Sequence, residues 1–105
     1  MNGFQLTFFT VQRRVHAGKP LAEWLIETAR AMDFRGATAI AGVQGLSHDG
    51  GLHAVTLFDQ ADQPVQVILV ATAEEAERFL SALNVLDKPL YYVKTPVEFG
   101  CAGKH

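Results

Sequence analysis

The chain has 105 residues, the common size of one domain with a single hydrophobic core. Hydrophobic residues make up 49% of it and charged residues 19%, a balance typical of a folded globular domain and not of a disordered chain. The formal net charge of −2 leaves no basic footprint, which argues against nucleic-acid binding driven by charge.

The sequence also bears on the compartment. No uncharged apolar run approaches the roughly 20 residues needed to span a bilayer, and the N-terminus lacks the basic start of a secretory signal. Cys101 is the single cysteine, so no intrachain disulfide can form, which fits a reducing compartment. We therefore expect a cytoplasmic protein that meets a membrane only through a partner protein.

The first predicted element is a strand over residues 4–11, which are rich in β-branched and aromatic side chains. Apolar side chains occupy both of its faces: Phe4, Leu6 and Phe8 on one, Phe9 and Val11 on the other. A strand that is apolar on both faces must be covered on both sides. The polar residues 12–19 predict a loop.

A helix is predicted from Pro20, because proline suits the first helical position, where its missing amide hydrogen has no intrahelical partner. One face of this helix carries apolar or small residues: Leu21, Trp24, Leu25, Thr28, Ala29 and Met32. Gly36 is placed to end the helix. Residues 37–43 are small and β-branched and predict a second strand.

The middle of the chain alternates loop and strand signals. Residues 44–51 hold three glycines, a serine, a histidine and an aspartate, which is typical of a loop. Residues 53–58 predict a third strand and residues 59–64 a turn. Residues 65–71 form the strongest strand pattern in the sequence.

Thr72 and Glu75 have the spacing of a capping box and predict the start of a second helix. Its apolar face comprises Ala76, Phe79, Leu80, Leu83 and Leu86. The last strand starts at residues 90–93 and extends to Phe99 if Pro96 lies at an edge or a bulge. Residues 1–99 are thus one domain, and residues 100–105 a flexible tail.

The order of elements predicts an α+β fold, the ferredoxin-like βαββαβ sandwich with an antiparallel sheet and two helices on one of its faces. The other sheet face carries apolar residues and needs a cover. A closed ring of subunits that pack sheet against sheet supplies one, so we expect a homo-oligomer.

Three segments resemble the PII signalling superfamily, and in particular the PII-like group known as domain-of-unknown-function family 190. They are residues 18–21, which open the first helix, residues 36–46, which run from the second strand into the glycine loop, and residues 63–75. The resemblance covers roughly residues 4–99. It implies a GlnB-like homotrimer with inward-facing sheets, which acts as a regulatory protein and not as an enzyme.

The resemblance also implies a ligand site and a partner site. In PII proteins an adenine nucleotide binds in clefts between subunits and sets the conformation of a loop, here residues 45–52, that contacts partner proteins. Carried over by position, the ligand-binding candidates are Thr38 near the base, Gln44, Gly45 and Leu46 near the phosphates, and the adjoining Ser47. The partner loop would present His48, Asp49, Gly50, Gly51 and His53.

Two features depart from the PII pattern. Between Gly36 and Gly45 the chain carries one residue more than typical PII proteins. PII proteins also have a glycine- and lysine-rich phosphate loop between the second helix and the last strand, whereas residues 84–89 here contain no glycine. The phosphate cradle is therefore absent or rebuilt, and a ligand other than a nucleotide remains an alternative.

A basic cluster follows the first strand and comprises Arg13, Arg14, His16 and Lys19. Beside a cleft between subunits it could hold a phosphate or a carboxylate metabolite, and we include Arg13 and Lys19 among the ligand-binding candidates. The alternative interpretation is a solvated charged turn. Lys88 and Lys94 are weaker candidates of the same kind.

Two other functions are weighed. His48 and His53 could bind a transition metal, as in trimeric ferredoxin-like copper-tolerance factors, but their spacing matches no tight motif, so no metal site is predicted. The other alternative is a small oligomeric enzyme with a site between subunits. Ser47, His48 and Asp49 are adjacent in sequence, and such neighbours rarely reach the geometry of a nucleophile and its base, so no catalytic residue is predicted.

Overall fold

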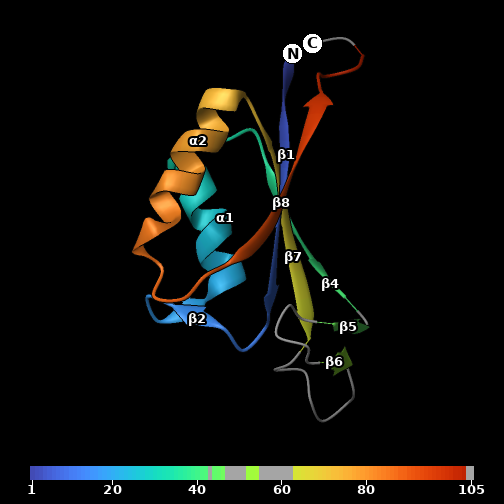
Figure 1. Ribbon diagram of the computed structural model, residues 1–105. Coiled ribbons are helices and arrows are strands. Elements are labelled where there is room, and N and C mark those ends of the chain that lie inside the picture. Colours follow the sequence, from blue (N-terminus) through green and yellow to red (C-terminus); the bar gives the residue numbers. More distant parts are fainter. Residues whose placement is uncertain (43, 47–51, 55–62, 104–105) are drawn as a thin grey trace.

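A computed structural model describes residues 1–42, 44–46, 52–54 and 63–103 (Figure 1). Four strands form an antiparallel sheet in the order β4-β7-β1-β8: β1 (Asn2–Val11), β4 (Ala37–Ala41), β7 (Pro64–Ala71) and β8 (Tyr91–Glu98). Helices α1 (Leu21–Ala31) and α2 (Ala73–Ala82) lie together on one side of it (Figure 1). This arrangement confirms the predicted ferredoxin-like fold.

Two short ribbons lie where loops were predicted. Residues 12–19 were expected to be a loop, but β2 (Val15–His16) pairs there with β3 (Lys19–Pro20). Residues 44–51 were also expected to be a loop, and β5 (Gln44–Leu46) instead pairs with β6 (Leu52–Ala54). Segments this short carry too few residues to show strand periodicity. The rest of the predicted third strand, residues 55–58, and Val43 lie outside the described residues.

The core lies between the helices and one sheet face. Phe8 is its centre, fully buried, with its ring 5.6 Å from that of Phe79 on α2, and Phe79 in turn lies 5.3 Å from Phe34. The other buried members are Leu6, Leu21, Leu25, Ala29, Val67, Leu69, Ala71 and Ala76. Because they come from β1, β7 and both helices, burial of this cluster fixes the two layers against each other.

The helix ends show which local sequence signals were sufficient to predict where a helix begins or ends. Thr72 caps α2 as predicted, its hydroxyl accepting from the Glu75 amide while the Glu75 carboxylate accepts from the Thr72 amide. Helix α2 then tightens into a 3-10 turn, η2 (Leu83–Val85). Helix α1 begins at Leu21, one residue after Pro20, and ends at Ala31 and not near Gly36. It ends early because Asp33 adopts the left-handed conformation with φ 63°.

We call the sheet surface that faces away from the helices the open face. Side chains alternate along a strand, so it carries the odd-numbered residues of β1 and β8 and the even-numbered residues of β4 and β7. Its larger apolar members are Phe9, Val11, Ile40, Ile68, Val70, Tyr91, Val93 and Val97. Ile40, Tyr91 and Val93 are 47%, 55% and 42% exposed, so the chain leaves much of this apolar surface open to solvent.

Strand β8 accommodates Pro96 because it is an edge strand. Met1 and Phe99 exchange two backbone hydrogen bonds of 2.8 Å, which sets the phase of the ladder between β1 and β8. Hydrogen-bonded and non-bonded pairs alternate in an antiparallel ladder, so the pair Phe4–Pro96 is a non-bonded one. The Pro96 nitrogen therefore points away from β1, where no ladder bond is lost, as the sequence required.

Candidate functional site

Several chain connections meet at one end of the sheet, where β1 ends and β7 begins; we call it the loop end. Gln12, just after β1, donates its amide to the carbonyl of Gln63, 2.9 Å away. Gly42, just after β4, donates to the carbonyl of Pro64 at 2.7 Å. Figure 1 shows β2, β5 and β6 at this end and both chain termini at the other. The base of the segment that carries the predicted partner loop is therefore tied to the end of β1.

The β2–β3 ribbon holds Lys19 against the first helix. Its turn places Ala17 and Gly18 in the left-handed region, with φ of 53° and 78°, which matches the twist of a two-residue hairpin. Beside it, His16 packs edge-on against Trp24 with ring centroids 4.6 Å apart. The Lys19 ammonium forms an ion pair with Glu27, and this hydrogen bond raises the pKa of Lys19. Its charge is therefore already matched by a carboxylate.

Arg14 connects the same turn to the segment between α2 and β8. Its backbone bonds to Val11 and Leu21, which fixes where the side chain leaves the chain. The guanidinium then donates to two consecutive carbonyl oxygens, from Nη1 to Pro89 at 2.8 Å and from Nη2 to Lys88 at 2.7 Å. Arg14 was predicted to belong to a basic cluster, but this contact could not be predicted, because no sequence pattern pairs Arg14 with residues 74 and 75 positions further along the chain.

Most of the predicted ligand-binding residues that the structure describes lie at the loop end, whereas Thr38 lies away from it. Arg13 and Lys19 lie at the loop end, in the turn after β1 and in β3. Gln44, Gly45 and Leu46 form β5, next to Gly42. Thr38 is exposed on the open face in the body of the sheet, opposite Ile68.

The tip of the predicted partner loop is not part of the described structure. Ser47, His48, Asp49, Gly50 and Gly51 lie outside the described residues. His53 lies in β6, where its backbone pairs with that of Gly45. The roles assigned to these residues, and to Thr38, Arg13 and Lys19, stay predictions.

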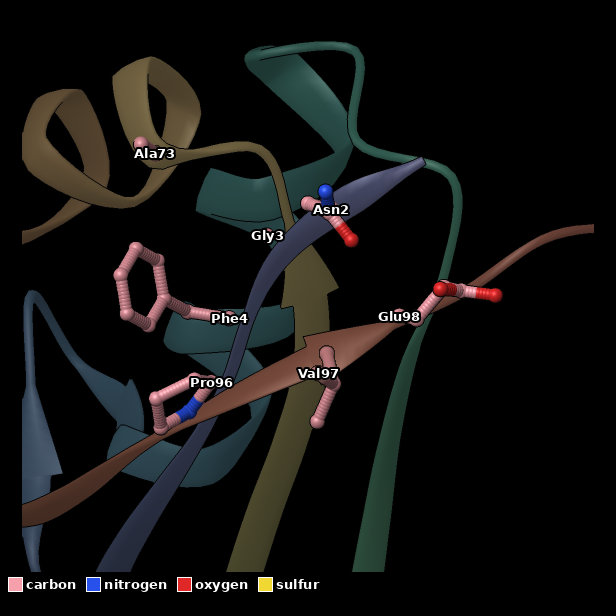
Figure 2. A pocket seen from close by; sticks show the side chains of 7 residues that line it. All are labelled: Asn2, Gly3, Phe4, Ala73, Pro96, Val97 and Glu98. Carbon is pink, nitrogen blue, oxygen red and sulfur yellow. The ribbon is translucent and has the colours of Figure 1, made fainter.

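Two surface hollows flank the helices. The first has a volume of about 410 Å³ and lies at the end opposite the loop end. Figure 2 shows its lining, which comprises Asn2, Gly3, Phe4, Ala73, Pro96, Val97 and Glu98. The Phe4 ring extends toward the α2 side of the strand in Figure 2, and the Lys94 ammonium lies 4.2 Å from its centroid. None of the predicted ligand residues lines this hollow.

The second hollow, about 340 Å³, lies between α1 and β4 and reaches the loop end at Gln12. Ala39 and Ala41 belong to its lining, together with the carboxylate residues Glu23 and Glu27. The alanines leave room where larger side chains of β4 would fill the space under α1. Ala39 and Ala41 were predicted to lie in a strand, and only the structure shows the hollow beside them.

The predicted absence of a metal site is not settled by the geometry. Within residues 1–42, 44–46, 52–54 and 63–103, no three histidine, cysteine, aspartate or glutamate residues gather as metal ligands. His48 lies beyond that part of the chain, so the metal alternative stays open. None of the described helices is long and apolar enough to cross a membrane.

Comparison with solved structures supports a PII-like fold. A PII-like signalling protein from Thermus thermophilus is 18% identical, with a TM-score of 0.59 over 91% of this chain and 89% of that chain. CPII, a nitrogen regulatory PII-like protein from Thiomonas intermedia, is 17% identical, with a TM-score of 0.57 over 92% and 89%. The CPII structure is bound to ADP, AMP and bicarbonate. At these identities the likeness concerns the fold.

The fold and topology are thus those of the PII-like proteins. The profile of the family DUF190, described as "Uncharacterized ACR, COG1993", matches residues 3–98. The chain belongs to this family, as the sequence resemblance indicated. No protein with a curated description matches the sequence.

Proposed function

We propose that the chain is a regulatory protein that binds a small ligand between subunits of a homotrimer and contacts a partner protein through residues 45–52. The observation that carries this proposal is the joint anchoring at the loop end. The bonds of Gln12 and Gly42 to Gln63 and Pro64 tie the base of the partner loop to the turn that carries the basic residues. A ligand held there would act directly on the chain segments from which the loop emerges.

The open face supports a closed assembly of subunits. Tyr91, Val93 and Ile40 are roughly half exposed on a surface made largely of apolar side chains. Such surfaces in soluble proteins usually mark an interface, and a ring of sheets packed face to face would cover this one. The open face does not distinguish three copies from another closed number, so the number three rests on the PII-like resemblance.

An adenine nucleotide is the ligand we propose. CPII shares the fold and binds ADP, AMP and bicarbonate, all of which are anions. Arg13 and Lys19, at the loop end, belong to the basic cluster that would meet such a group. The ligand would bind one conformation of residues 45–52 better than others and shift the population by that difference in affinity.

This role needs no covalent chemistry, and we propose that the protein is not an enzyme. With a net charge of −2 and no basic footprint, we also propose that its partners are a protein and a small molecule and not a nucleic acid. We propose with this role that the protein is cytoplasmic and meets a membrane only through a partner protein.

A thermal-shift screen tests the proposal against its rivals. ATP, ADP, AMP, cyclic nucleotides, bicarbonate, Cu²⁺ and Zn²⁺ are added separately to the full chain. A ligand at about 100 times its dissociation constant stabilises the folded state by about 2.7 kcal/mol, which is readily measured. A shift with a nucleotide supports the proposal. A shift with a metal alone, lost in His48→Ala/His53→Ala, would favour a metal-binding protein, and no shift with any nucleotide overturns the nucleotide role.

A further inference from the structure

Among the described residues, no carboxylate pairs with the charge of Arg14. Its guanidinium has five N–H donors, and two of them are used by the neutral carbonyl oxygens of Lys88 and Pro89. Among the described residues these oxygens are its hydrogen-bond acceptors, and no ion pair includes it. Lys19 and Arg35, by contrast, each bind a carboxylate. Arg14 is therefore a positively charged group that is already oriented and still has donors to offer.

The surroundings of Arg14 add positive charge. Arg13 precedes it in the chain, and Lys88, whose carbonyl it holds, is exposed in the segment before β8. The acidic neighbour in that segment is Asp87, which is also exposed and forms no ion pair with Arg14. Glu23 and Glu27, the nearest acidic residues of α1 in sequence, act on Lys19. Among the described residues, Arg13, Arg14 and Lys88 thus place three cationic residues at this corner, and Asp87 adds one carboxylate.

We propose that Arg14, assisted by Lys88, binds the anionic group of the ligand, a phosphate or another small oxyanion. The inference rests on the proposed function and specifies which side chain meets the ligand's charge. A guanidinium presents paired N–H groups that match two oxygens of an oxyanion, and such charge-assisted bonds are stronger than those to neutral carbonyls. Holding Lys88 and Pro89 costs Arg14 two donors and leaves three for the anion.

Through Arg14, a bound anion would be linked to the start of β8. The guanidinium that binds the oxyanion also holds the carbonyls of Lys88 and Pro89, which lie three and two residues before Tyr91, the first residue of β8. Any change in the position of Arg14 on binding therefore acts on the entry to that strand. Lys19, which the sequence placed among the ligand candidates, would be a weaker anion contact because Glu27 already occupies it.

The first test observes Arg14 directly in the unmodified chain. Pyrophosphate is titrated into the protein while the Nε–H resonances of the arginines are followed by NMR, with Arg30 at the far end of α1 as the control. We expect a saturable shift of the Arg14 resonance and none beyond bulk salt effects at Arg30. An Arg14 resonance that stays unchanged, or that moves in parallel with Arg30, overturns the inference whether or not a nucleotide binds elsewhere.

The second test separates ligand contact from loop positioning. Affinities for AMP and for adenosine, which lacks the phosphate, are compared in wild type, Arg14→Gln, Arg14→Lys and the control Arg30→Gln. Loss of a charge-assisted contact should weaken AMP binding at least about tenfold in Arg14→Gln and leave adenosine binding unchanged. Equal losses for AMP and adenosine, or no loss for AMP, would overturn the inference.

The same measurements distinguish a failure of the nucleotide role from a failure of the anion site. If pyrophosphate binds saturably at Arg14 and an adenine nucleotide binds no more tightly than pyrophosphate, the anion site is supported and the nucleotide role is rejected. AMP binding that does not depend on Arg14 keeps the nucleotide and rejects the anion site.

Discussion

Arg35 and Glu75 form an ion pair in which guanidinium nitrogen and carboxylate oxygen lie 2.8 Å apart, although 40 residues separate them in the chain. The same carboxylate accepts from the amide of Thr72 and so caps α2. The Arg35 guanidinium also lies 5.2 Å from the centroid of the Phe99 ring. One pair of side chains thereby joins the connection between α1 and β4, the start of α2 and the residue that follows β8.

We expect Glu75→Ala to lower the free energy of unfolding by about 1 kcal/mol, because it removes both half of the capping box and the partner of Arg35. Chemical denaturation measures the change. Glu77→Ala is the matched control, since Glu77 is exposed on the same helix and should change stability by less than about 0.5 kcal/mol. Equal effects of the two substitutions would show that the cap and the ion pair do not contribute.

The stability of the protein should also fall in acid through Glu75. The hydrogen bond from the Thr72 amide, followed by the one from Arg35, holds the pKa of Glu75 below its ordinary value. A carboxyl group whose pKa is lowered on folding stabilises the folded state above its unfolded pKa and loses that contribution as pH falls through its folded pKa. The stability difference between wild type and Glu75→Gln should therefore shrink in acid. A difference that is constant from neutral pH into the acid range would contradict the assignment.

Gly3 is required by a close backbone approach. A Cβ atom at this position would lie 2.1 Å from the carbonyl oxygen of Ala71 and 2.8 Å from Cε1 of Phe99. Because Ala71 belongs to a neighbouring strand, its backbone cannot yield cheaply, and Gly3→Ala should destabilise the fold by about 1–3 kcal/mol. Gly36→Ala, with nothing within 4 Å of its Cβ, is the control. If Gly3→Ala and Gly36→Ala unfold at the same urea midpoint, the steric explanation is ruled out.

The open face should hold the subunits together. A charge at Val93 would be buried without a partner in an assembly that covers this face, so Val93→Glu should dissociate it. Val85→Glu places the same charge at an exposed site in η2 and should leave the assembly intact. Sedimentation velocity measures the mass. Wild type should sediment at three times the mass of one chain, and a monomeric wild type, or a Val93→Glu variant of unchanged mass, would contradict this role of the face.

The sequence was most informative where a local signal and the hydrophobic pattern agreed. Thr72 and Glu75 predicted the start of α2 because a capping box satisfies two backbone amides by purely local bonds. The alternation of Phe4, Leu6 and Phe8 predicted the strand, and the structure shows that this face packs against the helices. Pro96 was predicted to lie at an edge or a bulge, since proline cannot donate to a ladder, and it lies in the edge strand β8.

What the sequence could not supply are contacts between distant segments. The end of α1 depends on the left-handed conformation of Asp33. The sequence had instead indicated Gly36 as the residue that ends the helix. The contact of Arg14 with Pro89 depends on how α2 returns the chain to β8, and no periodicity encodes it. The candidate site is made mostly of such contacts, which is why its residues were predicted as a group and their individual partners were not.

Ligand binding at the loop end should change the conformation of the partner loop. Hydrogen exchange of the full chain, with and without the nucleotide that gives the largest thermal shift, tests it most directly. We predict that this nucleotide changes amide exchange in β5 and β6, Gln44–Leu46 and Leu52–Ala54, while the core of β1 and β7 changes little. A nucleotide that stabilises the protein but leaves amide exchange in β5 and β6 unaltered would contradict the proposed coupling between the ligand site and the partner loop.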